Sequence, residues 1–281
     1  TRTPEELEEV LRTFMEGLSR EVQANSDVVK WMDVVNETFC GARMKGIGYD
    51  AGASDNTVTY EADDWFGPRA GVEIWENPWP ILGFETAVTD DGTFEVPKYI
   101  RMAFEIAQRN APDVKLIYNE HGKTMLPALW EKLRKTVLYL LSQQIRVDGI
   151  GWQAHIQLGW EKDPENLRQL REMIAWCHEN GLEFHITELD VTVANKDSKM
   201  NTSCLEATRD AQAATIGAVV ETMLQNIGQG ACGVNFWTMT DRFREGTTFA
   251  TLFDTEANPQ PAYYKVKELL LKYADQSSNN R

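Results

Sequence analysis

The sequence predicts an α/β fold: a (β/α)8 TIM barrel of which this chain holds strands four to eight and their helices, lacking the first three strands. Apolar runs of strand length alternate with amphipathic segments of helix length, which indicates a parallel sheet with crossover helices. Polar residues stand at the carboxyl end of every predicted strand, as expected where strands ring a common site. No predicted strand is followed by the glycine-rich loop of an open, nucleotide-binding sheet.

The chain begins on an amphipathic helix. Thr3 and Glu6 form a capping box around Pro4, and apolar residues recur at helical spacing as far as Val22. The predicted strands are residues 31–36, 114–119, 147–155, 183–189 and 233–238. The predicted helices are residues 97–110, 127–145, 164–180, 205–227 and 261–274. A long insertion-like loop occupies residues 38–96. We expect 1–281 to be a single, partial domain whose first three strands lie upstream.

Composition excludes several classes of function. The chain has 281 residues, with 28 Lys and Arg against 43 Asp and Glu, a formal charge of −15. That balance argues against a nucleic-acid partner, because phosphate binding needs clustered basic residues. The four cysteines show no metal spacing and are too scattered for a disulfide framework. No apolar run reaches the roughly 20 residues that span a bilayer, and no His, Asp or Glu cluster has ligand spacing.

Two glutamates each close an apolar, strand-like run: Glu37 ends the segment DVVNE, and Glu188 lies in FHITELD. Carboxylates at the carboxyl ends of parallel strands stand where an α/β barrel places its chemistry. Two carboxylates are also the minimum needed to cleave a glycosidic bond, one as acid and the other as nucleophile or base. A neutral sugar substrate fits the acidic composition.

These two segments resemble the active-site signatures of glycoside hydrolase family 10, the endo-β-1,4-xylanases. Further segments agree with that family in order: YN at 118–119, DGIGWQAH at 148–155, FWTMTD at 236–241, LFD at 252–254 and PQPAYY at 259–264. The resemblance implies a (β/α)8 barrel that hydrolyses β-1,4-xylosidic bonds within xylan, with retention of configuration and without cofactor or metal.

The resemblance also implies a role for each matching residue. Glu37 corresponds to the general acid/base and must carry a proton to donate to the leaving oxygen. Glu188 corresponds to the nucleophile. Carboxyls roughly 5 Å apart would give retention through a glycosyl-enzyme intermediate. The substrate-binding candidates are Asn36, Gln153, His155, Trp237, Tyr118 and Asn119. Among them, His155 corresponds to a histidine bonded to the nucleophile, and Trp237 to the floor under the reactive sugar. Asp190 supports these groups from behind.

Departures from the family pattern keep alternatives open. An aspartate, an aromatic residue and an asparagine usually follow the YN segment, whereas this chain has Glu120, His121 and Gly122. The loop at 38–96 carries four large aromatic residues, which either bind sugars beyond the cleavage point or pack on one another: Trp65, Phe66, Trp75 and Trp79. The same fold could therefore act on another β-glycan, such as a glucan or mixed-linkage polymer. A non-catalytic polysaccharide-binding barrel is the alternative from a different class.

The expected partners are xylan or xylo-oligosaccharides, with no nucleic acid and no membrane span. We expect the chain to fold poorly without the missing N-terminal barrel segment, because the flanking strands would keep unpaired edges. A carbohydrate-binding module is a further candidate partner. A polymeric substrate implies a secreted, cell-surface or periplasmic location, although the chain itself opens without a signal peptide.

Overall fold

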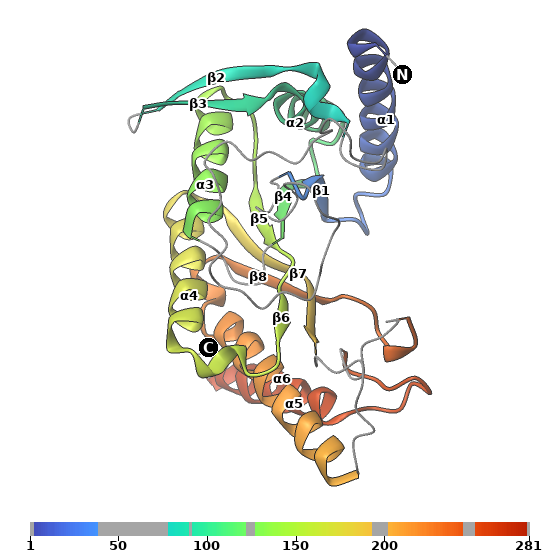
Figure 1. Cartoon of the computed structure of the whole chain (residues 1–281), viewed down its shortest axis with the longest axis vertical. Coiled ribbons are helices and arrows are strands. Elements are labelled where there is room, and N and C mark those ends of the chain that lie inside the picture. The colour runs from blue at the N-terminus through green and yellow to red at the C-terminus, as the bar shows by residue number, and fades with distance from the viewer. Residues whose placement is uncertain are drawn as a thin grey trace. The chain divides into compact units, whose positions relative to one another are not determined.

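The computed structural model describes residues 3–38, 78–89, 92–121, 127–192, 202–243 and 251–279. The chain divides into two compact units, and Figure 1 labels the helices and strands of both. The first unit comprises Thr1–Glu120 and Leu126–Gly149. The second comprises His121–Met125 and Ile150–Arg281.

Helix α1 (Pro4–Ala24) opens the first unit with the predicted capping box. The Thr3 N–H donates to the Glu6 carboxylate at 2.9 Å, and the Glu6 N–H donates to Thr3 Oγ1 at 3.3 Å. Leu7, Leu11 and Met15, spaced four residues apart, form a buried stripe. This stripe packs α1 against α2 (Lys98–Asn110), as amphipathic spacing requires.

Strands β1 (Trp31–Asn36) and β4 (Lys115–Glu120) form a parallel pair that brings two predicted site segments together. Trp31 pairs with Lys115, and Asn36 pairs with Asn119 at the carboxyl end. After helix α3 (Pro127–Ser142), the chain returns to β4, where the Asp148 N–H donates to the Leu116 carbonyl at 2.8 Å. These contacts confirm the predicted strand–helix–strand alternation in this unit.

The end of the predicted loop is ordered as a hairpin, which corrects the interpretation of residues 38–96. A 3-10 turn η2 (Trp79–Leu82) leads into β2 (Phe84–Thr89), which pairs antiparallel with β3 (Gly92–Pro97). Ala87 and Val96 are fully buried on one face. Alternating apolar and polar residues on both sides of a short segment that ends in glycine predict a hairpin, and this pattern is present here. Residues 39–77, with Trp65, Phe66 and Trp75, lie outside the described residues.

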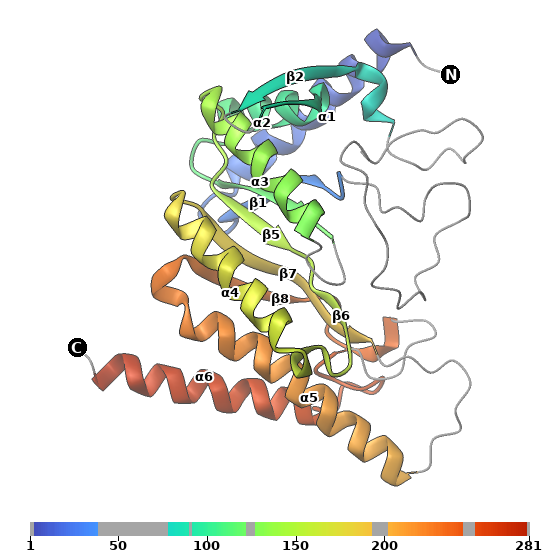
Figure 2. The ribbon, with the colours of Figure 1, turned by 60° about the vertical axis from the view of Figure 1, so that its left-hand side comes forward.

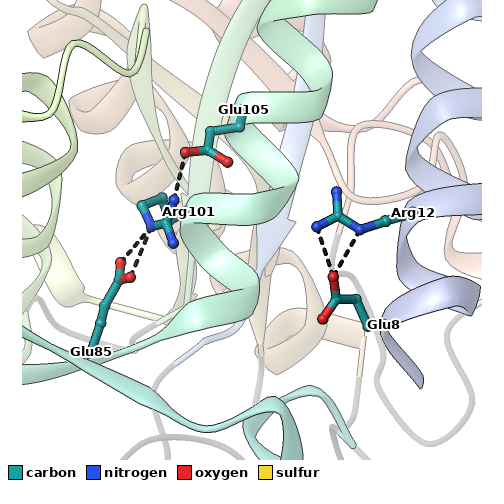
Figure 3. A network of polar contacts seen from close by, with 5 residues as sticks. All are labelled: Glu8, Arg12, Glu85, Arg101 and Glu105. Carbon is teal, nitrogen blue, oxygen red and sulfur yellow. Dashed lines mark hydrogen bonds and ion pairs between the residues drawn. The ribbon is translucent and has the colours of Figure 1, made fainter. Parts of the chain in front are cut away.

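Arg101 of α2 ties the hairpin to the helix (Figure 3). Its Nε lies 2.8 Å from Glu85 Oε2 of β2, and its Nη1 lies 2.6 Å from Glu105 Oε1 one turn along α2. The Glu85 side chain is 16% exposed, so its charge is largely withdrawn from water. On α1, Arg12 and Glu8 form a separate pair at 2.7 Å, with both side chains more than two fifths exposed.

We expect Arg101→Met to lower the free energy of unfolding by about 1–2 kcal/mol, because a part-buried Glu85 would lose its charged donor. The matched substitution Arg12→Met should cost only about 0.3–0.5 kcal/mol, because it breaks an exposed pair within one helix. Urea denaturation of both variants measures the difference. Equal losses would show that the Arg101 pair contributes no more than a surface contact.

The second unit is built around the long strand β7 (Glu183–Thr192). It is hydrogen-bonded to β5 (Gly149–Trp152) and pairs parallel with β6 (His155–Gln157) and β8 (Ala231–Phe236). His155 lies opposite Asp190, and Leu189 lies opposite Phe236. The predicted strand 147–155 is therefore wrong as one element: it breaks at Ala154, whose φ of 58° is left-handed, and β6 begins at the next residue.

Helices cover the strands of this unit. Helix α4 (Pro164–Glu179) packs on β7, and α5 (Thr202–Gln225) packs on β7, β8 and α6 (Pro261–Asn279). Figure 2 shows α6 running beside α5. Short 3-10 turns connect the elements: η3 (Trp160–Lys162), η4 (Ile227–Gln229) and η5 (Asp241–Phe243). Phe184, Ile186 and Leu189 of β7 are fully buried at the centre of the unit. Among the described helices, none is long and apolar enough to cross a membrane.

Candidate active site

In the second unit, the His155 imidazole lies between two carboxylates. Its Nε2 is 3.2 Å from Glu188 Oε2, and its Nδ1 is 3.1 Å from Asp190 Oδ1. His155 pairs with Asp190 across β6 and β7. Glu188 and Asp190 are two residues apart in β7, so both side chains can reach the same imidazole. The Glu188 side chain is 13% exposed, whereas Asp190 is completely buried. Asp190 thus holds the ring from the protein interior while Glu188 keeps access to solvent.

Trp237 lies next to this histidine, just beyond the end of β8. The two ring centroids are 6.0 Å apart with an interplanar angle of 81°. The backbone N–H of Trp237 donates to the Leu189 carbonyl at 3.1 Å, so Trp237 is positioned by the residue that follows Glu188. Trp237 is 44% exposed. An exposed indole face beside the histidine that contacts Glu188 is a surface on which a sugar ring can stack.

In the first unit, the chain turns sharply at Glu37, whose φ of 52° is left-handed. The next residue, Thr38, is completely buried, and its N–H and Oγ1 both donate to Glu120 Oε2, at 3.0 and 2.9 Å. The Tyr118 hydroxyl lies 2.7 Å from Thr38 Oγ1. Because Thr38 gives its proton to Glu120, Tyr118 donates to Thr38. This chain of hydrogen bonds holds the backbone directly after Glu37.

Burial and the neighbouring Glu120 carboxylate raise the pKa of Tyr118 well above its ordinary value of 10.0. The phenol therefore stays protonated and remains a donor to Thr38. Tyr118 is fully buried, so in this unit it supports Thr38 from behind. The sequence predicts Tyr118 as a substrate contact and gives no indication of the role of Thr38. The only signal for this network was Glu120, a longer acid where the family usually has aspartate.

Asn36 is oriented by its partner across the β1–β4 pair. Asn119 Nδ2 donates to Asn36 Oδ1 at 2.8 Å, and Asn119 itself is buried. This bond turns the amide nitrogen of Asn36 away from Asn119. Gln153, the remaining predicted binding residue, is buried directly after β5. The structure thus brings together Asn36 with Asn119 in one unit, and Glu188 with His155 and Trp237 in the other.

Replacing Glu120 by glutamine should lower the free energy of unfolding by about 1–3 kcal/mol, because two buried donors of Thr38 would lose their charged acceptor. The matched control is Glu95→Gln, which alters an exposed Thr–Glu bond formed by Thr86 at 2.7 Å. That surface change should stay within about 0.5 kcal/mol. Urea denaturation compares the two. A Glu120→Gln variant as stable as Glu95→Gln would show that the network does not hold Thr38.

Parallel strands with covering helices, and acids and aromatic residues at the strand ends, define an α/β protein with a candidate site at the carboxyl ends of its strands. The comparison with known families is specific: the model of glycosyl hydrolase family 10 matches residues 92–269, more than half of the chain. The chain belongs to glycosyl hydrolase family 10, and its fold class is the (β/α)8 barrel. The matched range contains Glu188, His155 and Trp237, whereas Asn36 and Glu37 precede it.

Individual relatives agree with the family. The chain is 34% identical over 179 residues to "Endo-1,4-beta-xylanase A" of Caldicellulosiruptor saccharolyticus, covering 60% of this chain and 51% of the relative. It is 28% identical over 219 residues to "Endo-1,4-beta-xylanase B" of Thermotoga neapolitana, covering 72% and 57%. The chain thus spans about half the length of these curated relatives.

Solved structures give the same result for the fold. Xylanase 10B from Thermotoga petrophila, crystallised with xylobiose, matches with a TM-score of 0.66 and 25% identity, over 97% of this chain and 68% of that one. Native xylanase 10C from Cellvibrio japonicus matches with a TM-score of 0.70 and 22% identity, over 97% and 52%. The strand alternation predicted from the sequence is therefore confirmed as part of a (β/α)8 barrel.

Proposed function

We propose that this chain carries the catalytic carboxylates of an endo-β-1,4-xylanase that hydrolyses xylan with retention of configuration. The arrangement of Glu188, His155 and Asp190 is the observation that carries the proposal. A carboxylate held in β7 by a histidine that itself lies against a buried aspartate is fixed in orientation, as a nucleophile must be. Membership in family 10 and relatives named as xylanases support xylan as the substrate.

In the proposed reaction, a Glu188 oxygen attacks the anomeric carbon of the xylosyl unit. The bond to the leaving oxygen breaks, and Glu37 donates its proton to that oxygen, which departs as the new chain end. The ester between Glu188 and the sugar is then hydrolysed: Glu37 takes a proton from water, and the water oxygen displaces Glu188 from the anomeric carbon. Two inversions restore the starting configuration, so the product is the β-anomer. Neither step calls for a metal or cofactor.

The neighbouring side chains have separate tasks in this proposal. His155 orients Glu188, and the amide of Asn36, set by Asn119, meets the sugar 2-hydroxyl at the cleavage point, where such bonds strengthen in the transition state. Trp237 forms an apolar floor for the ring. Glu120 fixes the peptide after Glu37 through Thr38 and so aims the proton donor.

The substrate assignment is tested by measuring reducing-sugar release from xylan, cellulose and mixed-linkage β-glucan. We expect release from xylan at least about a hundredfold faster than from the other two, a difference of about 2.7 kcal/mol in transition-state binding. The Glu188→Ala variant is the control for contaminating activity. Faster release from β-glucan than from xylan would transfer the proposal to the alternative substrate. Equal release by wild type and Glu188→Ala would favour a non-catalytic, polysaccharide-binding role.

A polymer that cannot cross a membrane must be met outside the cytoplasm, so we propose a secreted, cell-surface or periplasmic location. We also propose that a further barrel segment completes the sugar-binding cleft, because the matched relatives are about twice as long as the part they share with this chain. This requirement is tested by purifying a longer chain that contains both parts and measuring whether it hydrolyses xylan.

A further inference from the structure

Three side chains of metal-ligand type meet where β7 and β8 begin. Among the described residues, Glu183, His185 and Cys232 each offer one ligand atom, and these atoms all lie within 4.8 Å of one another. Glu183 and His185 belong to β7, and Cys232 belongs to β8. The sequence spacing gave no indication of this cluster, because its third member comes from a different strand.

Strand geometry explains how the cluster forms. Glu183 and His185 are two residues apart, so they lie on the same face of β7. Phe184 pairs with Ala231, but His185 pairs with Gly233, so Cys232 is an extra residue in β8 at this point. Gly233 gives the imidazole its room: a Cβ there would lie 3.3 Å from His185 Nδ1. The ring can therefore lie across β8 beside Cys232.

The histidine of this cluster is nearly buried, whereas its carboxylate and its thiol are more exposed. His185 Nε2 lies 3.1 Å from Glu183 Oε2, and the imidazole is only 9% exposed. Glu183 is 26% exposed, and Cys232 is an exposed cysteine whose Sγ lies 3.5 Å from the Gly230 carbonyl. The histidine is thus held in place, while the carboxylate and the thiol stand at the solvent side, where a hydrated ion can enter.

We propose that Glu183, His185 and Cys232 bind one zinc ion, with water as the fourth ligand. Carboxylate oxygen, imidazole nitrogen and thiolate sulfur are the ligands that zinc prefers, at about 2.0–2.3 Å in a tetrahedron. Such a tetrahedron separates its ligand atoms by roughly 3.5 Å, and the Glu183–His185 pair is already close to that separation. Rotation of the exposed Cys232 side chain brings Sγ into range. Binding replaces the thiol proton with the metal and releases that proton to solvent.

The proposed ion would join the first residues of β7 and β8, and it goes beyond the proposed hydrolysis. Glu188 follows Glu183 by five positions on β7, which places the two about 16 Å apart along the strand. The zinc is therefore a stabilising link that takes no part in the chemistry. It should raise the melting temperature, and the rise should grow with the logarithm of the zinc concentration above the Kd, because the ion binds only the folded strands.

The test uses untagged, metal-free protein titrated with Zn²⁺ and, for spectroscopy, with Co²⁺. We expect one zinc per chain by elemental analysis, a thiolate-to-cobalt charge-transfer band, and a melting temperature that rises with zinc. The Cys232→Ser variant should lose the band and bind zinc at least about tenfold more weakly. Loss of a side chain that merely supports a ligand already weakens metal binding by that factor, so loss of a ligand should weaken it at least as much. Because Cys232 is exposed, the circular dichroism of the Cys232→Ser variant should match that of the wild type.

Two controls separate this site from other thiols and from catalysis. Cys177 is completely buried, and burial raises the pKa of its thiol, so Cys177→Ala should keep both the band and the affinity. Glu188→Ala should bind zinc as the wild type does, whether or not the proposed hydrolysis holds. The proposal is overturned if the protein takes up no stoichiometric zinc, or if Cys232→Ser binds it as tightly as the wild type.

Discussion

Replacing Glu188 by alanine is expected to lower kcat on xylan by at least about 10⁴-fold, as removal of a covalent nucleophile does. Neither other carboxylate of β7 can take its place, because Asp190 is completely buried against His155 and Glu183 lies five residues away along the strand. Folding should survive, since the Glu188 side chain contributes to the imidazole contact but not to the buried centre of the unit. Initial rates on xylan measure the loss, and circular dichroism verifies the fold.

Chemical rescue makes this expectation specific to a nucleophile. A small anion such as azide can enter the space left in Glu188→Ala and attack the anomeric carbon of a xylobioside with a good leaving group. A single displacement gives the α-glycosyl azide, whose configuration is read by NMR. Asp190→Asn is the matched control: it weakens the support of His155 and should slow turnover without rescue by azide. Residual activity in Glu188→Ala above one tenth of wild type would remove the assignment.

Replacing Glu37 by alanine is expected to have the second largest effect, and its size should depend on the leaving group. On xylan, kcat should fall by about 10²–10⁴-fold, the contribution of a positioned general acid/base. On an aryl xylobioside whose phenol is acidic, the first step needs no proton, so the rate constant for release of the phenol should change little. Release of the sugar then becomes slow, because water lacks its base.

Rapid-mixing kinetics distinguish these steps. Glu37→Ala should show a burst of phenol equal to the enzyme concentration, followed by a slow steady state, and a lower KM than the wild type. Glu37→Gln, which keeps the size of the side chain, should behave in the same way. A uniform loss across good and poor leaving groups would contradict the role of Glu37 as proton donor.

The alternation of strands and helices could be predicted because burial imposes a period on the sequence. Apolar runs such as the one before Glu188 indicate strands, and the capping box at Thr3 marks the start of α1. The sequence also contains the pattern that predicts the hairpin β2–β3, because apolar and polar residues alternate before Thr89 and after Gly92.

Contacts between distant residues could not be predicted from local patterns. A glutamate at a strand end looks the same whether it faces solvent or, like Glu120, receives two bonds from Thr38. Ala154 offers no indication that it adopts a left-handed conformation, which is imposed where β5 ends and His155 comes opposite Asp190. The contact of His155 with Glu188 was predicted only through resemblance to family 10, and the geometry confirms it.

The covalent intermediate offers the most direct test of the central claim, which is that Glu188 attacks the sugar. A 2-deoxy-2-fluoro-β-xylobioside with an activated leaving group forms its glycosyl-enzyme quickly and hydrolyses it slowly. Proteolysis and mass spectrometry then locate the attached sugar. We predict one fluoroxylobiosyl group per chain, on Glu188. A label on any other residue, or hydrolysis of xylan by a protein that the reagent never labels, would contradict the account.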